Sequence, residues 1–154
     1  MPTTTAAPPR ESLQPDIAVT AGRVRLAVSR INRRMRRNAE AGISLSQLSA
    51  LVAIERAKKL TVGELAAAEQ VTPPSMTKIA ASLETAGLVR REPDATDRRI
   101  GWLSLTSDGS RRLASIRGRK NAYLAKRLKV LSPEEIRLVE RALPVLERLA
   151  EEPD

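Results

Sequence analysis

The chain has 154 residues, of which 42% are apolar, and a formal net charge of +9. This length allows one domain with a substantial core, and the charge suggests a polyanionic partner, although a solvated basic face would carry the same charge. The sequence contains no cysteine and no histidine, which excludes disulfides, thiolate metal sites and the most common general base of enzymes.

Membrane insertion and secretion are not expected either. No apolar run approaches the ~20 residues of a membrane-spanning helix, and the N-terminus lacks the positive-then-apolar pattern of a signal peptide. We therefore expect a cytoplasmic protein with no membrane partner. Trp102 and Tyr123 are the only aromatic residues, so the core must be aliphatic, which suits helices.

The N-terminal part divides into an arm and a long helix. Residues 1–15 are rich in proline and threonine and are predicted to form a disordered arm. Residues 16–42 are predicted to form a dimerisation helix that ends at Gly42. Its apolar residues recur every three or four positions, a pattern typical of helix-to-helix packing: Ile17, Ala21, Val24, Val28, Ile31 and Met35.

Seven arginines between Arg23 and Arg37 cover the other faces of this helix. They are suited either to contacts with the flanks of a bound DNA or to ion pairs with glutamates of the last helix across a dimer. We favour ion pairs and solvent, where each pair contributes roughly 0–1 kcal/mol.

The middle of the chain carries clear helix boundaries. Capping boxes at Ser44–Gln47 and Thr61–Glu64 predict the starts of two short helices. Thr72 is the predicted N-cap of the next helix, with Pro73 at its first position and Gly87 at its left-handed stop. The inward face of this helix is apolar: Met76, Ile79, Ala80 and Leu83.

The opposite face of the 72–87 helix is small and polar. Small residues let a helix backbone approach base edges, and serine, threonine and lysine supply hydrogen bonds. The alternative is an ordinary solvated surface. The residues of this face are Pro74, Ser75, Thr77, Lys78, Ala81 and Thr85.

Residues 88–91 and 100–105 are predicted to be paired strands around a charged turn. Helix, turn, helix and β-hairpin in this order predict a winged helix-turn-helix over residues 43–106, which places one helix in a DNA groove. The fold class is therefore mainly α with a small β-hairpin, flanked by long terminal helices.

Residues 107–154 are predicted to form C-terminal dimerisation helices. Thr106 caps a helix over about 107–131, and a third capping box at Ser132–Glu135 starts a helix over about 133–150. Apolar stripes near both ends of so small a chain predict a shared helical interface, and hence a homodimer.

From residue 43 to 106 the sequence resembles the MarR (multiple antibiotic resistance regulator) family, and the flanking helices extend the resemblance over nearly the whole chain. The fragments that carry it are Ser46–Leu48, Thr61–Ala66, Val71–Thr77, Leu83–Val89, Asp97–Arg99, Leu103–Thr106 and Gly109. The resemblance implies a homodimeric, cytoplasmic bacterial transcription factor that binds palindromic double-stranded DNA operators, usually as a repressor. In many members a small-molecule effector that binds between the dimer helices and the DNA-binding lobe releases the DNA.

Transferred to this sequence, the resemblance makes the 72–86 helix the recognition helix. Asp97 is expected to pair with an arginine and hold the shape of the wing. Of Arg98 and Arg99 we expect one to be structural and one to reach the minor groove, with Arg98 the more exposed. The full expected DNA-binding set is Thr61, Thr72, Pro74, Ser75, Thr77, Lys78, Arg98 and Arg99.

The sequence identifies no effector-binding residues. The absence of cysteine and histidine removes the thiol and metal sensing that some relatives use, and the near-absence of aromatic residues argues against an aromatic-lined pocket.

Two other classes of function fit the sequence less well. A nonspecific nucleoid-associated or RNA-associated protein would explain the charge equally well, but the aromatic residues that stack on single-stranded bases are missing. An enzyme is not expected, because no catalytic set and no glycine-rich phosphate loop is present. No cofactor and no metal are expected.

Overall fold

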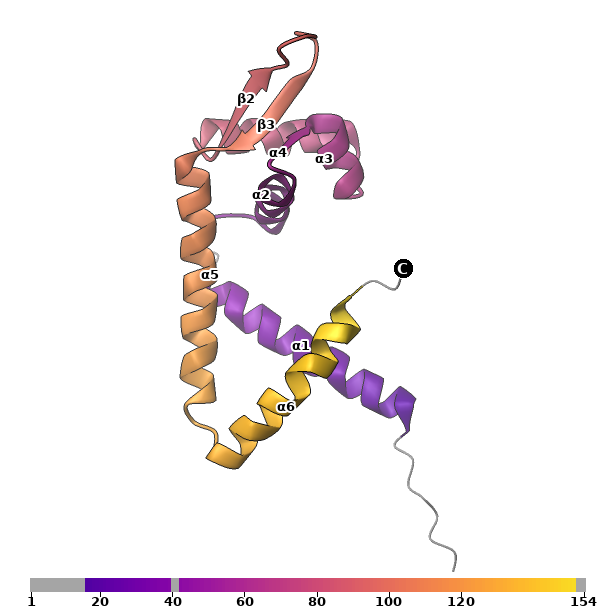
Figure 1. Ribbon diagram of the computed structural model, residues 1–154, viewed down its shortest axis with the longest axis vertical. Coiled ribbons are helices and arrows are strands. Elements are labelled where there is room, and N and C mark those ends of the chain that lie inside the picture. The colour runs from indigo at the N-terminus through magenta and orange to yellow at the C-terminus, as the bar shows by residue number, and fades with distance from the viewer. Residues whose placement is uncertain (1–15, 40–41, 152–154) are drawn as a thin grey trace, which may run out of the picture. The chain divides into compact units, whose positions relative to one another are not determined.

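The computed structural model describes residues 16–39 and 42–151 (Figure 1), so the predicted disordered arm over residues 1–15 lies outside the described residues. The chain divides into two compact units whose boundary falls within the first helix, between Arg34 and Met35. The elements in chain order are α1 (Ile17–Ala39), α2 (Leu45–Ala57), β1 (Lys59–Thr61), α3 (Val62–Ala68), α4 (Pro73–Thr85), β2 (Val89–Pro93), β3 (Gly101–Leu105), α5 (Ser107–Leu128) and α6 (Pro133–Ala150).

The predicted capping boxes are confirmed at the starts of α2, α3 and α6. At α2, Ser44 Oγ accepts from the Gln47 backbone N–H at 3.1 Å, and Gln47 Oε1 accepts from the Ser44 N–H at 2.9 Å. Each box satisfies two backbone donors that a helix N-terminus otherwise leaves unpaired. These helix starts are therefore encoded by residues three positions apart.

Thr72 occupies the predicted N-cap of α4, but its side chain makes no capping hydrogen bond. Pro73 and Pro74 fill the first two helical positions and have no backbone N–H to be capped. The Thr72 hydroxyl instead donates to Ser75 Oγ at 2.9 Å. At the other end of α4, Gly87 adopts a φ of +69°, which confirms the predicted left-handed stop.

The sheet has three antiparallel strands in the order β1–β3–β2, so the prediction of a two-stranded hairpin was incomplete. Leu60 of β1 pairs with Leu103 of β3, and Arg91 of β2 pairs with the same residue. The third strand arises because Lys58, at a φ of +70°, turns the chain from α2 directly into β1. Three residues are too few to show the alternation by which a strand is recognised.

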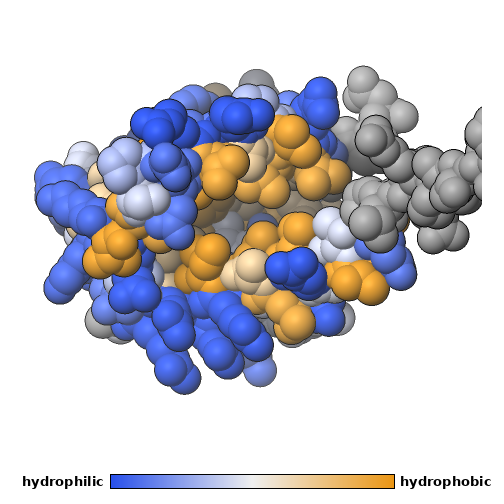
Figure 2. Space-filling model, turned by 90° about the horizontal axis from the view of Figure 1, so that it is seen from below, coloured by the Kyte–Doolittle hydropathy of each residue, from blue (hydrophilic) through white to orange (hydrophobic). Residues whose placement is uncertain are grey.

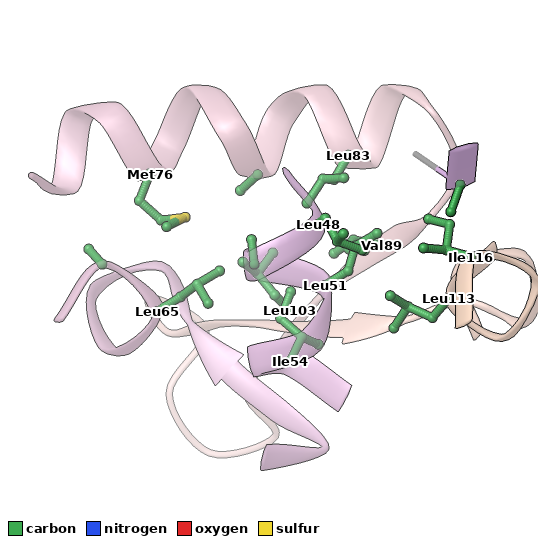
Figure 3. Packing of buried hydrophobic residues seen from close by; sticks show 14 residues of the cluster. Leu48, Leu51, Ile54, Leu65, Met76, Leu83, Val89, Leu103, Leu113 and Ile116 are labelled. Carbon is green, nitrogen blue, oxygen red and sulfur yellow. The ribbon is translucent and has the colours of Figure 1, made fainter. Parts of the chain in front are cut away.

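The core lies in the second unit and is built from aliphatic residues and Met76 (Figure 3). The predicted inward face of α4 is confirmed, since Met76, Ala80 and Leu83 are buried and Ile79 packs against them. Figure 3 shows Met76 and Leu83 directed from α4 into a cluster that includes residues of α2, α3, β3 and α5: Leu51, Ile54, Leu65, Leu103, Leu113 and Ile116. This core fixes which face of α4 remains outside.

Among the described residues, many apolar side chains on the stripes of the terminal helices remain exposed. Ile17 of α1 is 82% exposed and Leu149 of α6 is 71% exposed, and Figure 2 shows apolar side chains at the surface beside hydrophilic ones. On α5, Gly109, Leu113 and Ile116 are buried. Three apolar or aromatic residues nearer its end, and one that follows the helix, are partly exposed: Tyr123, Leu124, Leu128 and Leu131. None of the described helices has the length and apolar character needed to cross a bilayer.

Candidate nucleic-acid interface

The outer face of α4 carries the predicted contact residues. Ser75, Thr77 and Lys78 are exposed, as are Thr72 and Pro74. They alternate with the buried positions of the same helix, so the core holds α4 with this face outward. Among the described residues, the Lys78 ammonium makes no ion pair or hydrogen bond, which leaves its charge available to a ligand.

The hydroxyl groups of this face differ in what they can offer. Thr77 Oγ1 donates to the Pro73 carbonyl at 2.9 Å, so it can only accept from a ligand. Ser75 Oγ accepts from Thr72, so its own proton is available for a phosphate or a base acceptor. Thr77 thus presents an acceptor and Ser75 a donor next to Lys78. Base edges carry both donors and acceptors, so each hydroxyl can find a complementary group there.

Thr61 lies in a different environment from the α4 residues. It is half-buried as the N-cap of α3. Its hydroxyl donates to Glu64 Oε2 at 2.9 Å and accepts from the Glu64 N–H at 3.2 Å. The backbone and side chain of Thr61 together hold the pKa of the Glu64 carboxyl below its ordinary value. The Thr61 hydroxyl is therefore engaged in holding the start of α3.

The wing consists of β2, β3 and the turn between them, residues 94–100, which we call the wing tip. In the tip, Arg99 donates from Nε to Asp97 Oδ1 at 3.0 Å and from Nη2 to Asp97 Oδ2 at 2.9 Å. These bonds lower the pKa of Asp97 and raise that of Arg99. Within the part of the chain that the structure describes, Arg98 makes no such bond. The tip therefore has one arginine in an ion pair and one free.

Sequence reasoning missed the organisation of the tip around Asp94 and Trp102. None of the sequence patterns described above connects these two residues. In the structure, Trp102 Nε1 donates to Asp94 Oδ2 at 2.8 Å. An aspartate two residues before a threonine at a turn is a signal for the local part of this network, but nothing local indicates the tryptophan.

Charge is distributed unevenly along the chain. Residues 43–106, which contain α4 and the wing, have eight basic and seven acidic residues, a net charge of +1. Helix α1 has seven basic residues and no acidic one, and α5 has seven basic residues and one acidic residue. The overall charge of +9 therefore lies mainly in the flanking helices. In the lobe, Arg90, Arg91 and Arg99 are in ion pairs, whereas Lys78 and Arg98 make no ion pair with any described residue.

The sequence matches the MarR family over residues 41–100. An HTH-type transcriptional regulator of Mycobacterium tuberculosis is 38% identical over 128 residues, which cover 82% of this chain and 90% of that protein. The chain belongs to the MarR family. This membership confirms the family resemblance found in the sequence, and it confirms that the chain is a transcriptional regulator of the helix-turn-helix class and not an enzyme.

Two further comparisons place this MarR-family regulator among known proteins. The HTH-type transcriptional repressor MdtR of Bacillus subtilis is 32% identical over 95 residues, covering 62% of this chain and 61% of MdtR. The crystal structure of a transcriptional regulator protein from Pseudomonas aeruginosa superposes with a TM-score of 0.79 at 34% identity, covering 88% of this chain and 97% of that one. The mainly helical fold with a small antiparallel sheet and long flanking helices is thus that of the family.

Proposed function

We propose that this MarR-family regulator is a homodimeric repressor that binds a palindromic double-stranded DNA operator. The observation that carries the proposal is the outer face of α4, where Ser75, Thr77 and unpaired Lys78 stand on the side opposite the buried Met76, Ala80 and Leu83. A helix with small, polar outward residues fits the major groove, where each base pair has a distinct pattern of donors and acceptors. Pro74 and Thr72 flank this contact.

The wing would contact the adjacent minor groove. Arg98 is the candidate for this contact, because its guanidinium has no partner among the described residues, whereas that of Arg99 is joined to Asp97. A free guanidinium at the end of a hairpin suits a narrow, electronegative minor groove. In this proposal Arg99 and Asp97 maintain the turn, and Thr61 caps α3.

The exposed apolar stripes of α1 and α6 support the homodimer. Val28 and Ile31 on α1, and Leu143 and Leu146 on α6, are each between 42% and 56% exposed in the single chain. Regular apolar stripes of this kind are normally covered by a partner, and two-fold symmetry is the most common arrangement for a soluble oligomer. The two recognition helices of such a dimer would enter half-sites about 34–36 Å apart.

Two observations favour different details of this proposal. The relative MdtR is named as a repressor, which supports the same sign of regulation here. The low net charge of the 43–106 lobe favours sequence-specific binding through a few individual contacts. A nonspecific nucleoid protein would instead neutralise phosphates with a broadly basic surface.

The decisive experiment is selection of bound sequences from random duplex DNA, combined with light scattering of the free protein. A palindromic consensus and a dimeric mass are expected. If the dimer makes ~6–10 phosphate contacts, its affinity should fall by roughly 10³–10⁵ between 50 and 200 mM salt. Equal affinity for the selected palindrome and a scrambled duplex would support the nonspecific alternative, and a monomeric mass at working concentration would contradict the dimer.

A further inference from the structure

The carboxylate of Asp94 collects four hydrogen bonds at the base of the wing tip. Asp94 Oδ1 accepts from the Thr96 N–H at 2.9 Å, from the Thr96 hydroxyl at 2.6 Å and from the Asp97 N–H at 3.1 Å. Asp94 Oδ2 accepts from Trp102 Nε1 at 2.8 Å. One side chain thus orders the turn and ties it to β3.

Trp102 extends this connection to the strand that precedes α3. Lys59 Nζ lies 4.5 Å from the centre of the Trp102 ring, a distance at which a cation and an aromatic face attract each other. Lys59 is in β1, and Trp102 is the register partner of Thr61 in the same strand. Contacts therefore run from β1 through Trp102 and Asp94 to the tip.

The residues that Asp94 holds are the two that directly precede Arg98. The tip is closed by two backbone bonds as well, from the Asp94 N–H to the Ile100 carbonyl and from the Ile100 N–H to the Asp97 carbonyl, both 2.9 Å. The Asp97–Arg99 pair acts within two residues, so it shapes the turn but does not connect it to the sheet. Among these side-chain contacts, the bond from Asp94 to Trp102 alone makes that connection.

We propose that Asp94 is a positioning residue that orients the wing tip, through Trp102, so that Arg98 meets the DNA. This inference rests on the proposed function, since it concerns how the proposed contact between Arg98 and the DNA is positioned. The four donors also hold the pKa of the Asp94 carboxyl well below its ordinary value. The group is therefore ionised at neutral pH and offers only acceptors to these donors.

If Asp94 positions the tip, the substitution Asp94→Asn should change DNA affinity in the opposite direction from the one that its charge alone predicts. Asp94→Asn removes a negative charge near the expected DNA and, by electrostatics alone, should strengthen binding. Positioning predicts weaker binding, because the amide loses acceptor capacity and brings a donor to a site that already has four. Glu92→Gln is the matched charge control, because it removes the same charge from an exposed residue of β2. In the described structure the Glu92 side chain pairs with Arg90 and not with a residue of the tip.

The experiment is a double-mutant cycle on operator affinity, with the selected palindrome as probe. Arg98→Ala should weaken binding by about tenfold in the wild-type protein, the loss typical of one good contact. In the Asp94→Asn background the same substitution should weaken binding by less than about threefold, because the tip no longer presents Arg98 in register. Glu92→Gln should leave the effect of Arg98→Ala unchanged.

A second readout needs no DNA. Trp102 is the only tryptophan, so its emission reports on the indole N–H bond, and Asp94→Asn should shift that emission. Trp102→Phe, which keeps an aromatic ring and removes the N–H donor, should reproduce the loss of coupling to Arg98.

The possible failures point to different conclusions. If the wild-type protein selects no operator, the proposed function fails. If it binds an operator but the losses from Asp94→Asn and Arg98→Ala are additive, or the emission of Trp102 does not change, the positioning role of Asp94 is wrong.

Discussion

Arg91 of β2 is joined to Glu84 in the last turn of α4 by two hydrogen bonds, Nε to Oε1 and Nη2 to Oε2, each 3.1 Å long. Their side chains are 40% and 28% exposed, respectively, so solvent weakens the attraction and the pair contributes little to stability. Its geometry matters more, because a two-point bond fixes an orientation as well as a distance. The pair connects the proposed recognition helix to the wing and fixes the angle between two surfaces that must meet neighbouring grooves.

Arg91→Ala should therefore reduce DNA binding much more than it reduces stability. We expect the free energy of unfolding to fall by less than about 1 kcal/mol, while operator affinity falls severalfold because the wing is less firmly oriented against α4. The exchange Glu84→Arg with Arg91→Glu keeps the net charge and restores a pair, so it should recover part of the affinity. Urea unfolding and operator titration measure the two effects, and an exchange variant no better than Arg91→Ala would contradict this account.

Lys78→Ala should reduce specific binding more than nonspecific binding. Lys78 has no partner among the described residues and lies on the outer face of α4 beside Ser75 and Thr77, where a base-edge contact is expected. The measurement compares affinity for the selected palindrome and for a scrambled duplex at one salt concentration. Lys126→Ala removes one cation from α5, outside the lobe, and should change both affinities alike. Equal losses from Lys78→Ala would make Lys78 a phosphate contact instead.

The parts of the fold that were predictable from the sequence depend on neighbouring residues. Capping boxes, Pro73 and Gly87 act over a few positions, so the starts of α2, α3 and α6 and the end of α4 were identified directly. The strand β1 was missed because its three residues are defined only by pairing with β3, which lies more than forty positions later. Tertiary pairing of this kind has no local signal.

The same distinction explains what was missed at the candidate site. The spacing of α4 gave both its buried and its outward face, because helical periodicity is local. The bonds from Trp102 to Asp94 and from Arg91 to Glu84 join residues eight and seven positions apart across a turn. They could not be predicted without the geometry of the hairpin in the first case and of the turn between α4 and β2 in the second. The overall charge suggested a polyanionic partner but did not show where that partner would bind, because the 43–106 lobe carries a net charge of only +1.

Gly109→Ala should be strongly destabilising, because Gly109 is buried in the first turn of α5. A Cβ at this position would lie 2.0 Å from the Leu88 carbonyl oxygen and 3.0 Å from its carbon, and that oxygen also accepts from the Thr106 N–H at 3.1 Å. Relieving the clash requires movement of the backbone where β3 passes into α5. We expect a loss of about 1–3 kcal/mol or more in the free energy of unfolding, measured in urea.

Gly118→Ala provides the control for this substitution in the same helix. A Cβ at Gly118 would have no atom within 4 Å, so the change should stabilise the protein by up to ~1 kcal/mol through helix propensity alone. Similar effects of the two substitutions would show that the contact between Gly109 and Leu88 does not constrain the fold.

The ion pair between Glu55 of α2 and Arg117 of α5 should make stability depend on pH. Arg117 Nη1 donates to Glu55 Oε1 at 3.0 Å, and Nη2 donates to Oε2. The hydrogen bonding from Arg117 is the main reason that the pKa of Glu55 lies below its ordinary value of 4.5. Because the folded protein binds this proton more weakly than the unfolded chain, the stabilisation is complete above pH 4.5 and is lost as the pH falls through the lowered pKa.

Glu55→Gln isolates this contribution from those of Glu64, Asp94 and Asp97, whose pKa values are lowered in the same direction. The two side chains are 32% and 53% exposed, so we expect the variant to be less stable by at most ~1 kcal/mol at about pH 7. The difference between the two unfolding curves should shrink as the pH falls below 4.5 and vanish once the pH has passed below the lowered pKa of Glu55, where both proteins lack the charge. A difference that stayed constant over this range would mean that Glu55 acts through packing and not through its ionised carboxylate.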